Sequence, residues 1–162
     1  MKRIWWGIAG LAIVGSAAAA VLVLRPDPII PPEIEDRLTS SLLLPDAEKA
    51  PVDTASVKYN DQEKLLSYKT AFAGTTILIS QQPTPEQFID IPAAYKKVTD
   101  QMNTYKTFES ANGTVFLTTP AQMKGRQAAV LNAKGTLLFA NPDKDLTEDQ
   151  WRRFFNALDV VR

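Results

Sequence analysis

The chain has 162 residues, of which 45% are hydrophobic and 22% are charged, values that are typical of a globular protein. Eighteen basic residues balance eighteen acidic ones, and the sequence contains neither cysteine nor histidine. The missing residue types exclude a disulfide framework, a thiol nucleophile and a lipid-modified cysteine. They also remove the usual ligands of zinc, copper and haem and the usual general base at neutral pH.

The first element is an uncharged segment from Ile4 to Leu24. As a helix it would be roughly 30 Å long, which matches the hydrocarbon core of a bilayer. Two basic residues precede the segment and acidic residues follow it from Asp27, so the positive-inside rule places the N-terminus in the cytoplasm. We predict a single-pass transmembrane anchor over residues 1–25, with membrane contact through residues 4–24.

A cleaved signal peptide is the alternative, because Ser16–Ala20 offers small residues after an apolar run. The apolar stretch continues through Val21–Leu24, past that site, which favours a retained anchor. The chain is then a cell-membrane protein with its C-terminal domain outside, or a secreted protein if the segment is cleaved. Both readings place the domain outside the cytoplasm.

Residues 26–55 are predicted to be a Pro-rich linker and an irregular lead-in. Four prolines between Pro26 and Pro32 favour a stiff, extended spacer. A short helical turn is expected over Asp36–Leu44 and irregular chain after it. Three of the eighteen basic residues flank the hydrophobic segment, which leaves fifteen basic against eighteen acidic residues in the rest. This balance argues against nucleic-acid binding.

Residues 56–162 are predicted to form the extracytoplasmic domain. Period-2 alternation and turn residues predict strands over the following ranges: 56–59; 66–72 paired with 75–80; 106–111 paired with 114–119; and 126–132 paired with 135–140. Asn112-Gly113 is the strongest hairpin signal, because a type I′ turn needs positive φ at both central residues. The other turns are expected at Ala73-Gly74 and Ala133-Lys134.

Two helices are expected between and after these strands. The first begins at Thr84-Pro85 and restarts at Pro92, with one apolar face formed by Tyr95, Val98, Met102 and Tyr105. The second has a capping box from Thr147 to Gln150, and Leu146 can pack against Trp151 as a hydrophobic staple. Its apolar stripe consists of Trp151, Phe154, Phe155 and Leu158.

The order of elements predicts an α+β fold, in which an antiparallel sheet carries two helices packed on one face. A PsbP-like sandwich has a similar order, which is an analogy of fold only.

Two groups of acidic residues are candidates for chemistry. The stretch Asn141–Asp149 has the alternating oxygens of a calcium loop, but Leu146 takes the position of the required Gly and Arg152 that of the final Glu. We interpret it as a loop that leads acidic residues into a helix N-terminus. The spacing of Glu86, Asp90 and Asp100 fits a solvated helix face better than an acid–base pair. We therefore assign no catalytic, cofactor-binding or metal-binding residue.

Three stretches of the domain carry a family resemblance: LLSYKTAFAGTTILISQQPTP (65–85), QAAVLNAKGTLLFA (127–140) and DLTEDQWRRFFNAL (145–158). Over residues 40–162 the layout resembles bacterial single-pass membrane proteins with a small extracytoplasmic α+β domain. That domain is similar to the C-terminal module of some anti-sigma-factor-like and lipoprotein-sorting-like envelope proteins. The resemblance implies a structural module and brings no catalytic residue to any position.

The anchor, the spacer and the missing catalytic residue types predict a non-enzymatic binding module of the cell envelope. Its partner would be an envelope protein or a cell-wall ligand. A second hypothesis is a carrier or sensor of an apolar ligand, held in a cavity between sheet and helices. A carboxylate-based hydrolase is a third, less favoured hypothesis. The sequence leaves the ligand, the physiological process and the oligomeric state open.

Overall fold

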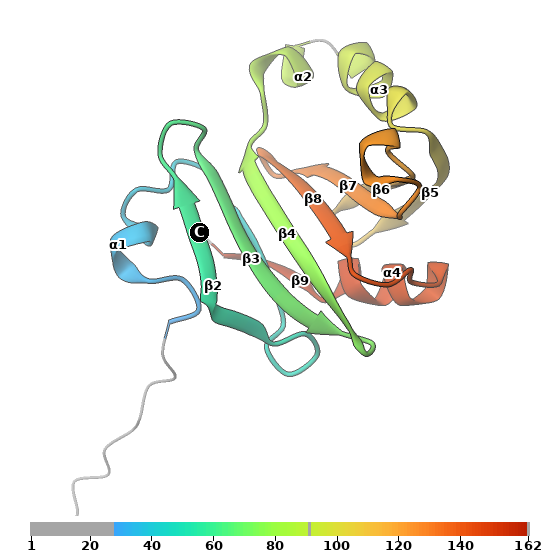
Figure 1. The fold of residues 1–162 in the computed structure, drawn as a ribbon. Coiled ribbons are helices and arrows are strands. Elements are labelled where there is room, and N and C mark those ends of the chain that lie inside the picture. Colours follow the sequence, from blue (N-terminus) through green and yellow to red (C-terminus); the bar gives the residue numbers. More distant parts are fainter. Residues whose placement is uncertain (1–27, 91, 162) are drawn as a thin grey trace, which may run out of the picture.

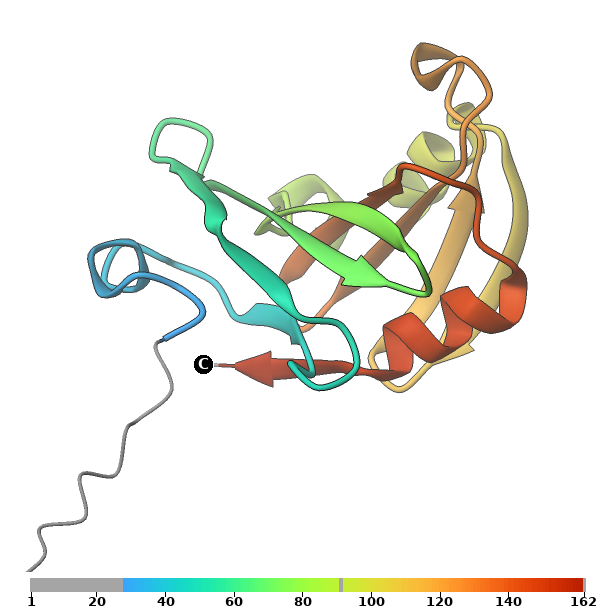
Figure 2. The same ribbon diagram turned by 60° about the horizontal axis from the view of Figure 1, so that its bottom comes forward.

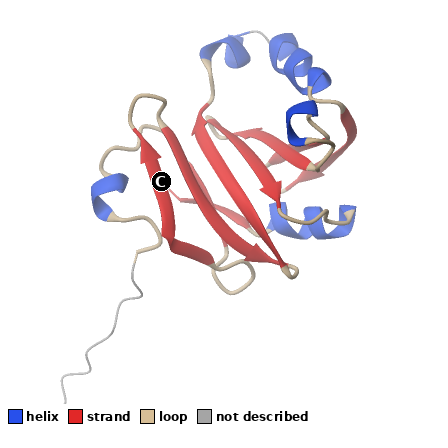
Figure 3. Cartoon of the chain, in the orientation of Figure 1, coloured by secondary structure: helices blue, strands red, loops and turns tan. Residues whose placement is uncertain are grey.

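A computed structural model describes residues 28–90 and 92–161 of the chain (Figures 1 and 3). The elements in chain order are α1 Pro32–Glu35, β1 Leu42–Pro45, β2 Val52–Asn60, β3 Leu65–Phe72, β4 Thr75–Pro83, α2 Glu86–Asp90, α3 Pro92–Gln101, β5 Thr104–Ser110, β6 Gly113–Thr118, the 3₁₀ turn η1 Ala121–Met123, β7 Ala128–Ala133, β8 Thr136–Pro142, α4 Glu148–Asn156 and β9 Leu158–Val161. The predicted anchor lies outside the described residues. Within them, no helix is long and apolar enough to cross a bilayer.

The main sheet has seven antiparallel strands in the order β2-β3-β4-β8-β7-β6-β5. It consists of two meanders, β2 to β4 and β5 to β8, which join where β4 pairs with β8. Helices α2 and α3 form the crossover between the meanders. A separate antiparallel pair, β1 with β9, lies against the sheet, and Figure 2 shows the sheet curving around this pair and α4. The predicted antiparallel α+β architecture is confirmed at this level.

Two-residue turns close three of the hairpins. Ala73 and Gly74 both have positive φ, 48° and 77°, as a type I′ turn requires. Lys134 and Gly135 repeat this arrangement with φ of 54° and 77°, one residue later than predicted. The third hairpin pairs Ser110 with Gly113, so its loop residues are Ala111 and Asn112.

The predicted type I′ turn at Asn112-Gly113 is therefore wrong, although the hairpin itself is confirmed. Gly113 already belongs to β6, and its φ of 133° is the only positive one within this turn. The Asn112 side chain has a tertiary role instead, because its Nδ2 donates to the Leu158 carbonyl at 2.8 Å. The asparagine at position 112 is therefore explained by a long-range hydrogen bond and not by the local turn chemistry that the sequence suggests.

Helix α4 packs on the concave face of the sheet. Thr147 and Gln150 form the predicted capping box. Trp151, Phe154 and Phe155 are fully buried. The Phe155 ring meets Phe108 of β5 at a centroid distance of 6.2 Å. The predicted aromatic stripe therefore forms the centre of the core.

Helix α3 packs on the opposite face, which corrects the prediction that both helices share one face. Its Tyr95 ring lies 5.4 Å from the ring of Phe116 in β6. Phe108, which α4 contacts, pairs with Val115. Neighbouring residues of a strand point to opposite faces, so Phe116 projects away from α4. The helix also ends before Tyr105, which is 51% exposed in β5 rather than on the apolar face of α3.

The lead-in between residues 28 and 55 belongs to the fold, which corrects its prediction as linker and irregular chain. Strand β1 is buried along its whole length, and Ile30, Leu38 and Ala50 join the same core. Helix α1 begins at the last proline of the predicted spacer and ends before the helical turn predicted over Asp36–Leu44, whose last three residues belong to β1 instead. Strand β1 bonds to Gln81 of the main sheet on one side, and on the other it faces Ile29 and Ile30 from the start of the same lead-in. A strand that is covered on both sides shows an unbroken apolar run instead of alternation.

Candidate functional site

Strand β1 is held on the sheet by buried side chains. The Gln81 amide of β4 accepts from the Leu43 N–H at 3.0 Å and donates to the Leu43 carbonyl at 3.3 Å. The Tyr68 hydroxyl donates to the same carbonyl at 2.9 Å. Burial raises the pKa of the Tyr68 phenol far above its ordinary value of 10.0, so it stays a neutral donor. These contacts fix where β1, and with it β9, lies.

The pairing of β1 with β9 builds one wall of a groove. Leu42 pairs with Val161, and Leu44 pairs with Asp159. Residues that pair in an antiparallel ladder share a face, so these four side chains line one side of the pair. The two leucines are buried, whereas Asp159 and Val161 are exposed. The wall is therefore apolar at its base and carries one carboxylate at its rim.

The lead-in supplies the opposite wall. Pro28–Ile30 and Glu35 line it, and the turn Pro45–Ala47 closes one end. The groove has a volume of about 430 Å³. Ligand sites in proteins have volumes of roughly 300–1,000 Å³, so the groove is large enough for a small ligand or a few peptide side chains.

The rim of the groove carries the carboxylates of Glu35, Asp46 and Asp159. The Lys49 ammonium lies 2.8 Å from Asp46. Its hydrogen bond is the main cause that lowers the pKa of Asp46 below the ordinary 3.8, and Asp46 in turn raises the pKa of Lys49. Asp46 is therefore ionised at neutral pH. Besides this ion pair the lining carries the Asp159 carboxylate, which favours a cationic occupant.

The acidic residues singled out in the sequence lie elsewhere. Glu86 begins α2 and is exposed, and Asp90 ends the same helix. Asp100 of α3 is exposed and forms an ion pair with Lys96 at 2.6 Å. Neither Glu86 nor Asp100 lines the groove. The exposure of these two residues agrees with a solvated surface.

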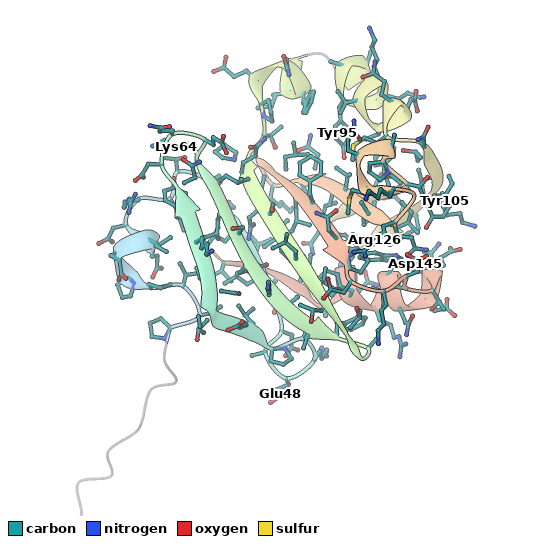
Figure 4. The ribbon with its side chains drawn as sticks, viewed as in Figure 1. Glu48, Lys64, Tyr95, Tyr105, Arg126 and Asp145 are labelled. Carbon is teal, nitrogen blue, oxygen red and sulfur yellow. The ribbon has the colours of Figure 1, made fainter. Side chains whose placement is uncertain are left out.

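The acidic stretch Asn141–Asp149 leads into α4, as the sequence suggests. Glu148 accepts from Arg152 at 2.8 Å and lies 3.2 Å from the Lys106 ammonium, and the hydrogen bond from Arg152 is the main cause that lowers the Glu148 pKa below 4.5. Asp145 projects at the surface near Tyr105 (Figure 4). Across the described part of the chain, no three His, Cys, Asp or Glu side chains are grouped to hold a metal ion.

Aromatic rings fill the space between α4 and the sheet. Phe154 and Phe155 meet edge to face at 5.5 Å, and Phe72 meets Phe154 at 5.3 Å. On the other face, the ring of Tyr95 lies between Phe88 and Phe116 at 5.5 and 5.4 Å. This packing disfavours a ligand cavity between the sheet and the helices, where the sequence places one.

The sequence does not point to the groove, because most of its lining lies in residues 26–55, which are predicted to be linker and irregular lead-in. The run LLLP (42–45) is the signal that points to it, since a short apolar run with a proline boundary suits a buried strand. A scan against models of protein families, a search of curated proteins and a search of solved structures each found no match to this chain.

Proposed function

We propose that this chain is a membrane-tethered, non-enzymatic binding domain of the cell envelope, and that the groove beside β1 and β9 is its binding site. Residues 4–24 are its anchor, and the domain lies outside the cytoplasm. The observation that supports this most is the position of Pro28, which lines the groove four residues after the predicted span ends at Leu24.

The short connection limits how far the groove can lie from the membrane. An extended chain spans at most about 3.3–3.6 Å per residue, so Pro28 lies within about 14 Å of the end of the span. The groove would therefore meet ligands at the bilayer surface or on neighbouring membrane proteins. The resemblance to envelope modules agrees with this position.

The chemistry of the surface supports a binding role. Cysteine and histidine are missing, and Asp46 of the groove rim and Glu148 of α4 take part in ion pairs at the surface. A hydrolase that uses carboxylates needs a pair of them in a cleft with separated pKa values. The groove instead combines aliphatic walls with negative charge, which suits recognition.

Single cysteines test the topology, because the natural chain has none. In intact cells, a membrane-impermeant maleimide should label Ala47→Cys in the groove and Glu63→Cys in the β2–β3 turn. Labelling only after the cells are broken would contradict the proposed orientation.

The same two positions test the site. A photoactivatable crosslinker on Ala47→Cys should give a discrete product in native membranes, and one on Glu63→Cys should not. Adding Asp159→Lys should remove the product from Ala47→Cys. Equal products from both positions, or a product that Asp159→Lys leaves unchanged, would show that the groove is not the binding site.

A further inference from the structure

The hydrogen bonds of the β1 backbone determine the direction in which the N–H and carbonyl groups of β9 point. The N–H and carbonyl of Leu43 both face the side chains of the main sheet, through Gln81 and Tyr68. Leu43 therefore has no hydrogen bond with its partner Val160 in β9. In an antiparallel ladder the two residues of such a pair both direct their polar groups outward. The N–H and carbonyl of Val160 thus point away from β1.

The outer edge of β9 is open at this residue. Strand β9 pairs only with β1. Leu158 lies two residues before Val160, so its carbonyl should also point away from β1. It does, because it accepts from Asn112 Nδ2 at 2.8 Å. No strand of the described chain pairs with Val160 on that side, and its side chain is 43% exposed. An open edge next to an apolar groove is the arrangement that strand addition uses.

We propose that the groove binds an extended peptide that adds to the outer edge of β9 and carries a lysine or arginine among apolar residues. The peptide backbone pairs with the N–H and carbonyl of Val160. Because strand faces alternate, every second peptide side chain lies beside Asp159 and Val161 on the groove face. The cationic side chain pairs with Asp159, and the apolar ones extend over Val161 into the groove. This inference rests on the proposed binding function of the same site.

Charge decides between a peptide and a phospholipid as occupant. The Asp159 carboxylate at the rim repels an anionic headgroup, whereas it attracts a lysine or arginine side chain. An acyl chain could fill the groove between the aliphatic walls, but it would leave the Val160 N–H without a hydrogen-bond acceptor. The open backbone and the negative rim together favour a basic, extended polypeptide.

The test uses the full-length protein in nanodiscs. The probe is a fluorescent heptapeptide of alternating valine and lysine, acetylated and amidated at its ends, and binding is followed by fluorescence polarisation. Three matched peptides or additives serve for comparison: the same peptide with N-methylated backbone amides, a valine–glutamate peptide, and monomeric dihexanoyl phosphatidylcholine as competitor.

We expect the valine–lysine peptide to bind at least tenfold more tightly than the N-methylated and valine–glutamate peptides. Val160→Pro removes the outward N–H without breaking a bond to β1, and Asp159→Lys reverses the rim charge. Each variant should weaken binding about tenfold or more. Glu63→Lys, an equal charge change in the distant β2–β3 turn, should bind within twofold of the natural protein. Thermal unfolding checks that all three variants are folded.

Binding that is insensitive to N-methylation, or equal for Val160→Pro and the natural protein, would refute strand addition. Displacement of the peptide by the phospholipid, together with insensitivity to N-methylation, would identify the groove as a lipid site and refute the peptide proposal. If the peptides fail to bind while the Ala47→Cys crosslink persists, only this inference is wrong. If neither peptide binding nor the Ala47→Cys crosslink is observed, the proposed binding function is wrong as well.

Discussion

Gln81 of β4 holds both polar backbone groups of Leu43 in β1, across 38 positions of sequence, at 3.0 and 3.3 Å. The contact is fully buried. A side-chain amide here replaces the ladder partner that β1 lacks on this side. It positions β1 for β9 and so shapes the groove wall, which links a core hydrogen bond to the proposed site.

Gln81→Met should destabilise the protein by about 2–3 kcal/mol, because the buried Leu43 N–H loses its acceptor. The Leu43 carbonyl keeps its bond from Tyr68. Gln82→Met, at the next position of the same strand, is the control and should change stability by less than about 0.5 kcal/mol. Equilibrium urea unfolding followed by circular dichroism measures both. Equal effects of the two variants would contradict the role given to Gln81.

Removal of two buried tyrosine hydroxyls should change the stability of the protein in different ways. Tyr68→Phe deletes a donor to Leu43 and should cost about 1 kcal/mol. Within the described residues the Tyr95 hydroxyl is buried without a well-formed hydrogen bond. Burial raises its pKa far above 10.0, although the hydroxyl lies close enough to the Asn132 backbone for that contact to lower the pKa, and it is neutral. Tyr95→Phe should therefore leave stability unchanged or raise it by up to about 1 kcal/mol. A large loss in Tyr95→Phe would reveal a partner for that hydroxyl.

The Ala73-Gly74 turn contains avoidable strain. Ala73 has a φ of 48°, a conformation that Asn adopts more readily than Ala, so Ala73→Asn should raise the free energy of unfolding by about 0.5–1 kcal/mol. Gly74→Ala should lower it by about 1–2 kcal/mol, and a Cβ there would meet no atom within 4 Å, so the loss is purely conformational. Thermal unfolding detects both shifts. A Gly74→Ala variant as stable as the natural protein would contradict the turn assignment.

The ion pairs of Glu148 should make stability depend on acid pH. Its pKa is lowered from 4.5 in the folded protein, first by the hydrogen bond from Arg152 and then by that from Lys106. Their stabilising effect is therefore complete above pH 4.5 and is lost as pH falls through the lower folded value. Glu148→Gln should flatten the curve of stability against pH below 4.5, and Arg152→Met should remove most of the same dependence. Unchanged slopes in both variants would contradict the pairing.

Local signals in the sequence predicted the local structure well. The capping box of Thr147 and Gln150 and the stripe of Trp151, Phe154 and Phe155 define α4 correctly, because helix caps and periodicity depend on a few neighbouring residues. The Ala73-Gly74 hairpin was equally legible. Both features are set by backbone preferences that act within about ten residues.

Long-range structure was not predictable in the same way. Nothing near Leu42–Pro45 reports that the strand pairs with Leu158–Val161, so the sequence predicts a helical turn up to Leu44 and irregular chain after it. The face on which α3 packs depends on the path of the crossover between β4 and β5. It also depends on the side of β6 to which the Phe116 side chain points. The groove was missed because of the first error alone, since its walls come from the two ends of the described chain.

The pairing of β1 with β9 also fixes when the protein can finish folding. β1 needs a partner that is made more than a hundred residues later, so the first strand stays apolar and unpaired until β9 has been synthesised. During that interval Leu42–Leu44 is an exposed apolar segment that is prone to aggregation unless a chaperone or the assembling sheet covers it. Deletion of Leu158–Val161 should therefore destabilise the whole domain, because it would leave β1 without its only ladder partner in the described part of the chain.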